Sequence, residues 1–278
     1  MYNVRRAAFA AAVVLLGSSG PAWAKDAVQE EESTPITVSG SATLASDYRF
    51  RGVSQTDKGM AIQGGLTVSH ESGFYVGTWA SNLSGWGTFG GANMELDLIG
   101  GFKTEIGGAM LDAGLVWYMY PSGADTTDFA EIFMKVSGST GPLTLTGGVA
   151  YAPRQDALAN VSNAPNSRGQ KQDNLYLSGD AAFAVADTPL TLKAHIGHSD
   201  GNPGLGPNGT SVSPTGSYWD WSLGVDASWR NLTLGVAYVD TDIGRAEAAR
   251  LQPNFSKGQD GTGSIANGAA VVTLTASF

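Results

Sequence analysis

The residues best placed to act on a charged solute come early in the chain. They are three charged residues at alternate positions of the segment SDYRFRG. Asp47, Arg49 and Arg51 stand two positions apart. In an extended chain, side chains two positions apart point to the same face, so these three groups would act on the same space. Where such basic groups oppose acidic ones across a channel, the resulting field orders passing polar solutes.

Acidic partners for the two arginines are expected on other extended segments, at a comparable height. These candidates are Glu95, Asp97, Glu131 and Asp220. We hypothesise that Arg49 and Arg51 face the acids across a constriction and shape selectivity. The alternative is structural, because the same arginines could pair with Asp47 or with loop carboxylates and only hold the first long loop. All six residues, the two arginines and the four acids, are predicted to line a pore.

Acids outnumber bases on the face that is expected to point inward. The acids are Glu71, Glu95, Asp97, Asp112, Glu131, Asp180, Asp220 and Asp226, and the bases are Lys103, Lys135, Lys193 and Arg230 besides the two arginines. An acidic excess in a channel favours cations. The sequence therefore predicts a mild cation preference.

Groups for covalent or metal chemistry are sparse, since the chain has three histidines and no cysteine. His195 and His198 differ by three positions, which in a strand puts them on opposite faces, so a shared metal is not expected. His70 lies beside Ser69 and Ser72, a pair that an outer-membrane lipid hydrolase could use. We treat that as the weakest alternative, and we predict no catalytic residues, no metal site and no cofactor.

The elements that would position these charges are β-strands, and residues 59–82 show the pattern. Ile62 and Leu66 fall on one face, whereas Gln63 and Thr67 fall on the other. This period of two is the repeat of a strand, in which successive side chains point to opposite sides of the sheet.

The same alternation returns in twelve segments down to the last residue, and their connections alternate between long loops and tight turns. That alternation is typical of an up-and-down meander. An open sheet in lipid would leave edge groups unpaired at a cost of several kcal/mol each, so the sheet must close. The sequence predicts an all-β, closed antiparallel up-and-down transmembrane β-barrel of twelve strands, within two either way.

Aromatic residues mark both ends of the predicted barrel. Phe74, Phe102, Phe183, Trp229 and Phe278 come at the tight-turn ends, and Phe50, Trp79, Trp117, Tyr151, Trp219 and Tyr238 come near the long loops. Two aromatic girdles around an apolar band are what a membrane interface selects. A soluble β-sandwich has no reason to place rings in this way.

The first 24 residues resemble a secretory signal peptide, with a positive start at Arg5 and Arg6, an apolar run and the cleavage pattern AWA. Residues 25–35 are acidic and without period, which predicts disorder, and residues 36–278 would form the barrel. No later stretch is apolar for long enough to span a membrane as a helix. The net charge of −9 gives no electrostatic case for binding nucleic acid.

Several blocks resemble the TorF-type family of outer-membrane porins. They are residues 48–56 (YRFRGVSQT), 61–65 (AIQGG), 73–82 (GFYVGTWASN), 95–97 (ELD), 117–121 (WYMYP) and 238–242 (YVDTD). The likeness extends over most of the chain and implies an outer-membrane barrel of a Gram-negative bacterium. The terminal Phe278 resembles the signal that the outer-membrane assembly machinery reads.

The function predicted from these features is passive diffusion of small polar or ionic solutes through a charged lumen. Its partners would be outer-membrane lipid and the solutes themselves, with no chemical step. The alternative is a non-conducting barrel, plugged by side chains or loops, that serves structure or surface contact.

Overall fold

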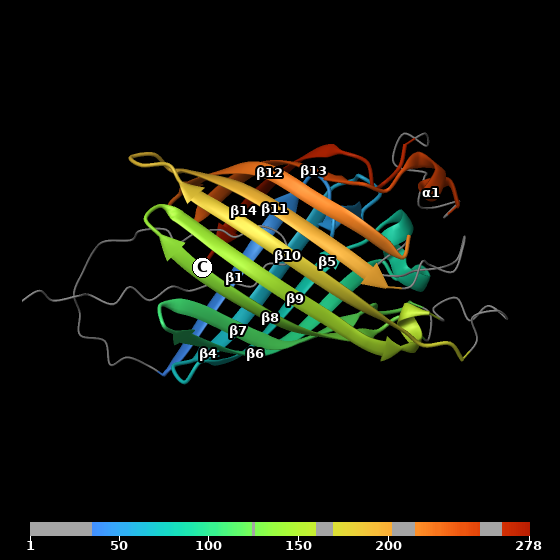
Figure 1. Ribbon diagram of the computed structural model, residues 1–278, viewed down its shortest axis with the longest axis horizontal. Helices are drawn as coiled ribbons and strands as arrows, with labels where there is room; N and C mark the ends of the chain where they lie inside the picture. Colours follow the sequence, from blue (N-terminus) through green and yellow to red (C-terminus); the bar gives the residue numbers. More distant parts are fainter. Residues whose placement is uncertain (1–34, 124–125, 160–168, 202–214, 251–262) are drawn as a thin grey trace, which may run out of the picture.

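The computed structural model describes residues 35–123, 126–159, 169–201, 215–250 and 263–278, so the predicted signal peptide and most of the acidic segment lie outside the described residues. Within the described residues, twelve antiparallel strands close into a barrel in the order β1-β14-β13-β12-β11-β10-β9-β8-β7-β6-β5-β4 (Figure 1). Their bounds are β1 Ile36–Ala45, β4 Ala61–His70, β5 Phe74–Asn82, β6 Met94–Ile106, β7 Ala109–Met119, β8 Phe129–Thr140, β9 Leu143–Gln155, β10 Gln172–Ala184, β11 Leu190–Gly201, β12 Ser217–Trp229, β13 Leu232–Thr241 and β14 Ala269–Ser277.

Strand formation follows the period-two pattern, and the outer face carries the apolar half of it. Ile62, Ile132 and Leu223 are each more than half exposed, while inward residues such as Glu131 and Asp220 are almost fully buried. β1 closes the cylinder by pairing with β4 on one side and with β14 on the other. The closed antiparallel barrel of twelve strands is therefore confirmed.

The two ends of the barrel differ, as the connection lengths predict. Tight turns gather at one end and the long connections at the other (Figure 1). The chain enters and leaves at the tight-turn end, where the backbone of Phe278 exchanges two hydrogen bonds with that of Gly40. Among the described residues, no helix has the length and apolarity that crossing a membrane requires.

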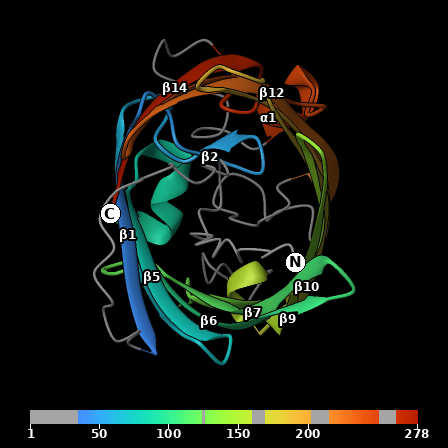
Figure 2. The same ribbon diagram turned by 90° about the vertical axis from the view of Figure 1, so that its left-hand side faces the viewer.

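The long connections contain short elements that the sequence pattern did not indicate. They are β2 Arg49–Phe50, β3 Val53–Ser54, the 3-10 helices η1 Gly85–Gly91 and η2 Asp156–Leu158, and the helix α1 Arg245–Arg250. β2 lies inside the ring of strands, and so does η1 (Figure 2). β1 ends at Ala45, so the first long connection, residues 46–60, leaves the wall and folds into the lumen. We call this segment the first loop.

The interior is apolar in places where the pattern predicts only polar side chains. Tyr75, Ile99, Val116 and Phe133 point inward and form a buried cluster with Tyr118 and Phe129. Towards the tight turns the lumen is lined by hydroxyl pairs, such as Thr43 with Thr275 at 2.9 Å. The polar inner face that the alternation predicts is thus interrupted by apolar side chains over part of the barrel's length.

The aromatic girdles are confirmed at most of their positions. Phe74, Trp229 and Phe278 are exposed at the tight-turn end, as are Trp117, Trp219 and Tyr238 near the long connections. The prediction is wrong for Phe50 and Trp79, which it places in the girdle near the long loops and which lie inside the barrel. Trp79 faces the lumen because its strand alternates from the outward Phe74, and Phe50 belongs to the first loop.

Candidate functional site

The first loop crosses the lumen on a backbone that requires glycine at one position. Arg51 has φ 48° and Gly52 has φ 79°, both in the left-handed region. A Cβ atom on Gly52 would also collide with Thr241 and lie 2.9 Å from the Cβ of Asp220. The Arg-Gly pair therefore makes the sharp bend that directs the arginine side chain across the barrel.

Arg51 reaches the wall opposite to the strand from which the loop starts. Its Nη2 donates to Oε1 of Glu131 on β8 at 2.5 Å, and its Nη1 donates to Oδ1 of Asn174 on β10 at 2.7 Å. β8 and β10 flank β9, which lies six places from β1 in either direction around the closed barrel. The guanidinium carbon also lies 4.1 Å from the ring centroid of Tyr176 and 4.8 Å from that of Phe50.

The ion pair keeps this guanidinium charged. Burial has the largest single effect and lowers the pKa of Arg51, but the charge and hydrogen bond of Glu131, together with Tyr118 and Tyr176, outweigh it and raise the pKa above its ordinary value. A planar guanidinium that is stacked between rings and bonded to a carboxylate is well held in place. Arg51 therefore contacts an acid on the far wall, while the hypothesis that this contact forms a selective constriction stays a prediction.

Arg49 follows the structural alternative. Its Nε donates to Oδ2 of Asp47 at 2.5 Å, and its Nη1 donates to the carbonyl oxygens of Gly52 and Ile265, both at 2.9 Å. These contacts join the first loop to the connection before β14. Arg49 is buried within the loop packing and faces none of the four predicted acids.

The four predicted acids are all buried on the inner face, in different surroundings. Glu131 accepts from Arg51 and also from the hydroxyl of Tyr118 at 3.2 Å. Glu95 accepts from the hydroxyl of Tyr48 in the first loop at 2.9 Å. Burial, followed by the charge of Glu95, raises the pKa of Tyr48 well above its ordinary value, so this phenol remains a neutral donor.

Asp220 and Asp97 differ from this pair. Asp220 binds the hydroxyl of Tyr176 at 3.1 Å and Nε2 of His195 at 3.1 Å. Asp97 is fully buried, and neither of its carboxylate oxygens has a hydrogen-bond partner within the described residues.

Nearer the tight turns, the inner face carries paired charges. The pairs are Lys103 with Asp112 at 3.6 Å, Lys193 with Asp226 at 3.1 Å, and Nδ1 of His195 with Asp180 at 2.7 Å. Two charged residues that the sequence pattern predicts to point inward, Glu71 and Arg230, are not on this face. Glu71 lies in an exposed tight turn, and Arg230 lies in another, with its guanidinium 5.0 Å from the ring of Trp229.

Sequence reasoning missed the neutral partners of these charges. Asn174, Tyr118 and Tyr176 complete the contacts of Arg51 and Glu131, and Tyr48 holds Glu95. All three wall residues have the inward phase of their strands, which is the signal that could have found them. Tyr48 had no such signal, because its position depends on the path of the first loop.

Groups for hydrolysis are not assembled in the described part of the chain. His70 bonds Ser72 at 2.8 Å and His198 bonds Ser217 at 3.0 Å, yet within that part no carboxylate binds the other nitrogen of either ring. The described residues also contain no group of three or more His, Cys, Asp or Glu side chains suited to a metal ion.

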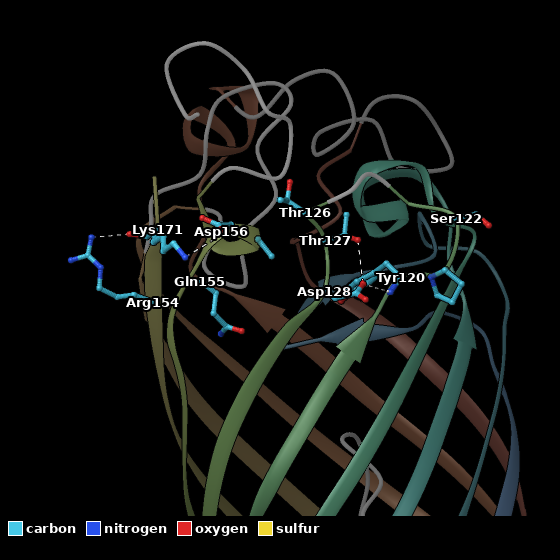
Figure 3. Close-up of a pocket in the computed structure, with 11 residues that line it drawn as sticks. Tyr120, Ser122, Thr126, Thr127, Asp128, Arg154, Gln155, Asp156 and Lys171 are labelled. Carbon is cyan, nitrogen blue, oxygen red and sulfur yellow. Dashed lines mark hydrogen bonds and ion pairs between the residues drawn. The ribbon is translucent and has the colours of Figure 1, made fainter. Parts of the chain in front are cut away.

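A polar pocket of about 520 Å³ opens at the long-loop end, above β8, β9 and β10 (Figure 3). Tyr120, Asp128, Gln155 and Lys171 are among its lining residues. Arg154 extends outward from it and donates to the carbonyl oxygen of Lys171 at 2.8 Å (Figure 3). The pocket is a rim feature, separate from the cross-lumen contacts of Arg51.

Known structures share this fold at low sequence identity. A NanC porin aligns with a TM-score of 0.52 and 9% identity, over 87% of this chain and 99% of its own. A KdgM porin aligns with a TM-score of 0.52 and 8% identity, over 86% and 99%. The fold is therefore that of porin-like outer-membrane barrels. No curated protein sequence matches the chain.

The family comparison covers nearly the whole barrel. Residues 29–278 match the family model described as a bacterial protein of unknown function (Gcw_chp). The TorF-type resemblance is not confirmed at that level of detail. The porin-like barrel whose lumen is crossed by Arg51 thus belongs to the Gcw_chp family.

Proposed function

We propose that this protein is an outer-membrane channel for the passive diffusion of small polar or ionic solutes, with its narrowest point at the Arg51 crossing. The observation that carries the proposal is the combination of an apolar outer face with a lumen lined by paired charges. Lipid would contact the outer face, and water would hydrate the charged groups inside. The resemblance of several sequence blocks to the TorF-type porins supports the same function.

The mechanism involves no chemical step. The first loop narrows the lumen, so that size is the first criterion for passage. Arg51 and Glu131 then present opposite charges at one height, which orients dipolar solutes. Because acidic side chains outnumber basic ones on the inner face within the described residues, we expect a mild preference for cations.

Export and assembly complete the proposal. Residues 1–24 would direct the chain to the periplasm, and Phe278 would be read by the outer-membrane assembly machinery. Phe278 is 73% exposed directly after β14, which leaves it available for such recognition.

A non-conducting barrel is the second candidate, and one observation favours it. Val53 of the first loop packs with Trp86, Tyr218 and Ile265 in a buried cluster at the long-loop end. Such packing could close the lumen and leave the long loops to contact other molecules.

Planar lipid bilayers separate the two candidates. The refolded mature chain is expected to give discrete conductance steps, with a reversal potential in a salt gradient that indicates weak cation selectivity. Heat-denatured protein is the control for adventitious leaks. If the folded barrel inserts, as shown by protection from protease, but carries no current over the whole accessible pH range, the channel proposal is wrong and the non-conducting barrel is favoured.

A further inference from the structure

The starting point is a carboxylic acid sealed beneath the first loop. Asp97 has no solvent exposure, and both of its oxygens are without a hydrogen-bond partner in the described residues. An ionised carboxylate in such a place costs several kcal/mol unless a counter-charge accompanies it. The fold tolerates this residue only if a positive charge offsets it or if it is neutral.

The cover over Asp97 is formed by the loop itself. Asp97 is the direct cross-strand neighbour of Trp79 on β5 and Tyr118 on β7. Tyr48 packs edge-on against Trp79, with ring centroids 5.3 Å apart, and Phe50 packs edge-on against Tyr118 at 5.9 Å. Two aromatic residues of the first loop thus press on the two neighbours that enclose the carboxyl group.

Within the described ranges, no surrounding group supplies the missing positive charge. The titratable groups that face Asp97 are Glu95 on its own strand, Tyr118 on β7, Glu131 on β8, Tyr120 after β7 and Tyr48 in the loop. On β5 the flanking residues are Trp79 and Ser81, which do not titrate. Arg51 is a cation near this site among the residues that the structure describes, but its donors are directed to Glu131 and Asn174. The two other carboxylates add like charge.

A proton is the cation that fits, because it needs no space. A metal ion or an ammonium group requires room for several ligands, and Asp97 contacts no solvent-sized space. A proton on the carboxyl group removes the charge without moving any neighbour. The loop backbone also suits a second conformation, since Arg51, Asp57 and Lys58 all have positive φ values and are strained in the docked state.

We propose that Asp97 is a proton-binding site that couples pH to the docking of the first loop. With Asp97 protonated, the loop stays in the lumen. When Asp97 ionises, the carboxylate needs water, so the loop leaves its position above Trp79 and Tyr118. The protein with the loop docked binds one more proton than the protein with the loop released. The fraction of molecules with a docked loop therefore falls as pH rises. The consequence, a conductance that increases with pH, rests on the proposed channel function.

The test uses a single cysteine, because the chain has none of its own. Val53 in the loop is 3% exposed, and V53C is close to it in size. Labelling of V53C by a membrane-impermeant maleimide, in vesicles between pH 4 and pH 9, reports loop release. The exposed rim variant P121C corrects for the pH dependence of the thiol reaction itself.

The expected result is that corrected labelling of V53C rises with pH, by up to about tenfold per pH unit for one linked proton. The rise should disappear in V53C/D97N and persist in V53C/D112N, since Asp112 is a lumen carboxylate with partners away from the loop. If the D97N variant fails to fold, the D97L variant is used in its place, because it also removes the charge at similar size.

The inference would be overturned if labelling of V53C depended equally on pH with and without Asp97. It would also be overturned if labelling were independent of pH in both proteins. Conductance read in parallel distinguishes the two proposals. Asp97-dependent labelling without any current would leave the proton site standing and refute the channel. A current together with pH-independent labelling would support the channel and refute the proton site.

Discussion

Arg49 and Arg51 are two positions apart, yet they make different contacts because the loop bends at Arg51 and Gly52. Arg49 precedes the bend and is surrounded by Asp47 and loop carbonyl groups, whereas Arg51 occupies the bend and projects to β8 and β10. Both side chains are buried. If the proposed channel function holds, the arginine expected to affect passage is the one whose partners lie on the far wall.

At the residue scale, R51A is expected to increase single-channel conductance and weaken solute discrimination, because it removes the side chain that crosses the lumen. It also leaves Glu131 buried without its counter-charge, at a cost of about 3–5 kcal/mol in folding free energy. Bilayer recordings and urea unfolding in vesicles measure the two effects.

The matched control is R154A, which removes an exposed arginine at the rim. The swap R51E/E131R should recover part of the stability that R51A loses. A conductance unchanged in R51A would show that this crossing does not limit passage.

Among the strands, inward glycines make room for aromatic side chains that lie flat on the inner wall. A Cβ atom on Gly101 would stand 2.5 Å from the hydroxyl of Tyr75, and one on Gly114 would stand 2.8 Å from the ring of Phe133. The adjacent Gly100 faces outward, with nothing within 4 Å. Glycine is thus a packing requirement at Gly101 and Gly114, and at Gly100 it is not.

At the element scale, G101A should destabilise the barrel by about 1–3 kcal/mol, because Tyr75 must move and its hydrogen bond to Asp112 at 2.7 Å is disturbed. The neighbouring G100A should be neutral or slightly stabilising. Urea unfolding in lipid vesicles compares them, and equal effects of the two substitutions would contradict the packing account.

The whole molecule is an inverted arrangement compared with a soluble protein, with apolar side chains outside and charges within. Many large apolar residues are exposed around the entire barrel, including Leu66, Ile132 and Leu223. A surface of this kind needs lipid.

At this scale the prediction concerns depth in the bilayer. L223R, at the centre of β12, should reduce the free energy of unfolding in vesicles by about 2–4 kcal/mol, while L232R, at the start of β13, should cost about 0–1 kcal/mol. The conservative L223A separates loss of the leucine from gain of the charge. Equal costs for the two arginine variants would argue against a membrane-spanning wall.

The sequence by itself determined the barrel, because its evidence is local. A strand reveals itself over a few residues by alternation, and the order of long and short connections follows directly from the chain. Closure then follows from the cost of unpaired edges in lipid. The inward phase of Glu95, Asp97, Glu131 and Asp220 is part of the same periodicity.

Only the tertiary structure decided what these side chains contact. Arg51 and Glu131 are 80 residues apart, and Asn174 is 123 residues from Arg51. Their meeting depends on the path of the first loop, which has no period and is directed by a bend at Gly52 and by packing on opposite walls. The same path turns Phe50 inward and seals Asp97, since a loop's direction is set by the contacts it finds and not by its own pattern.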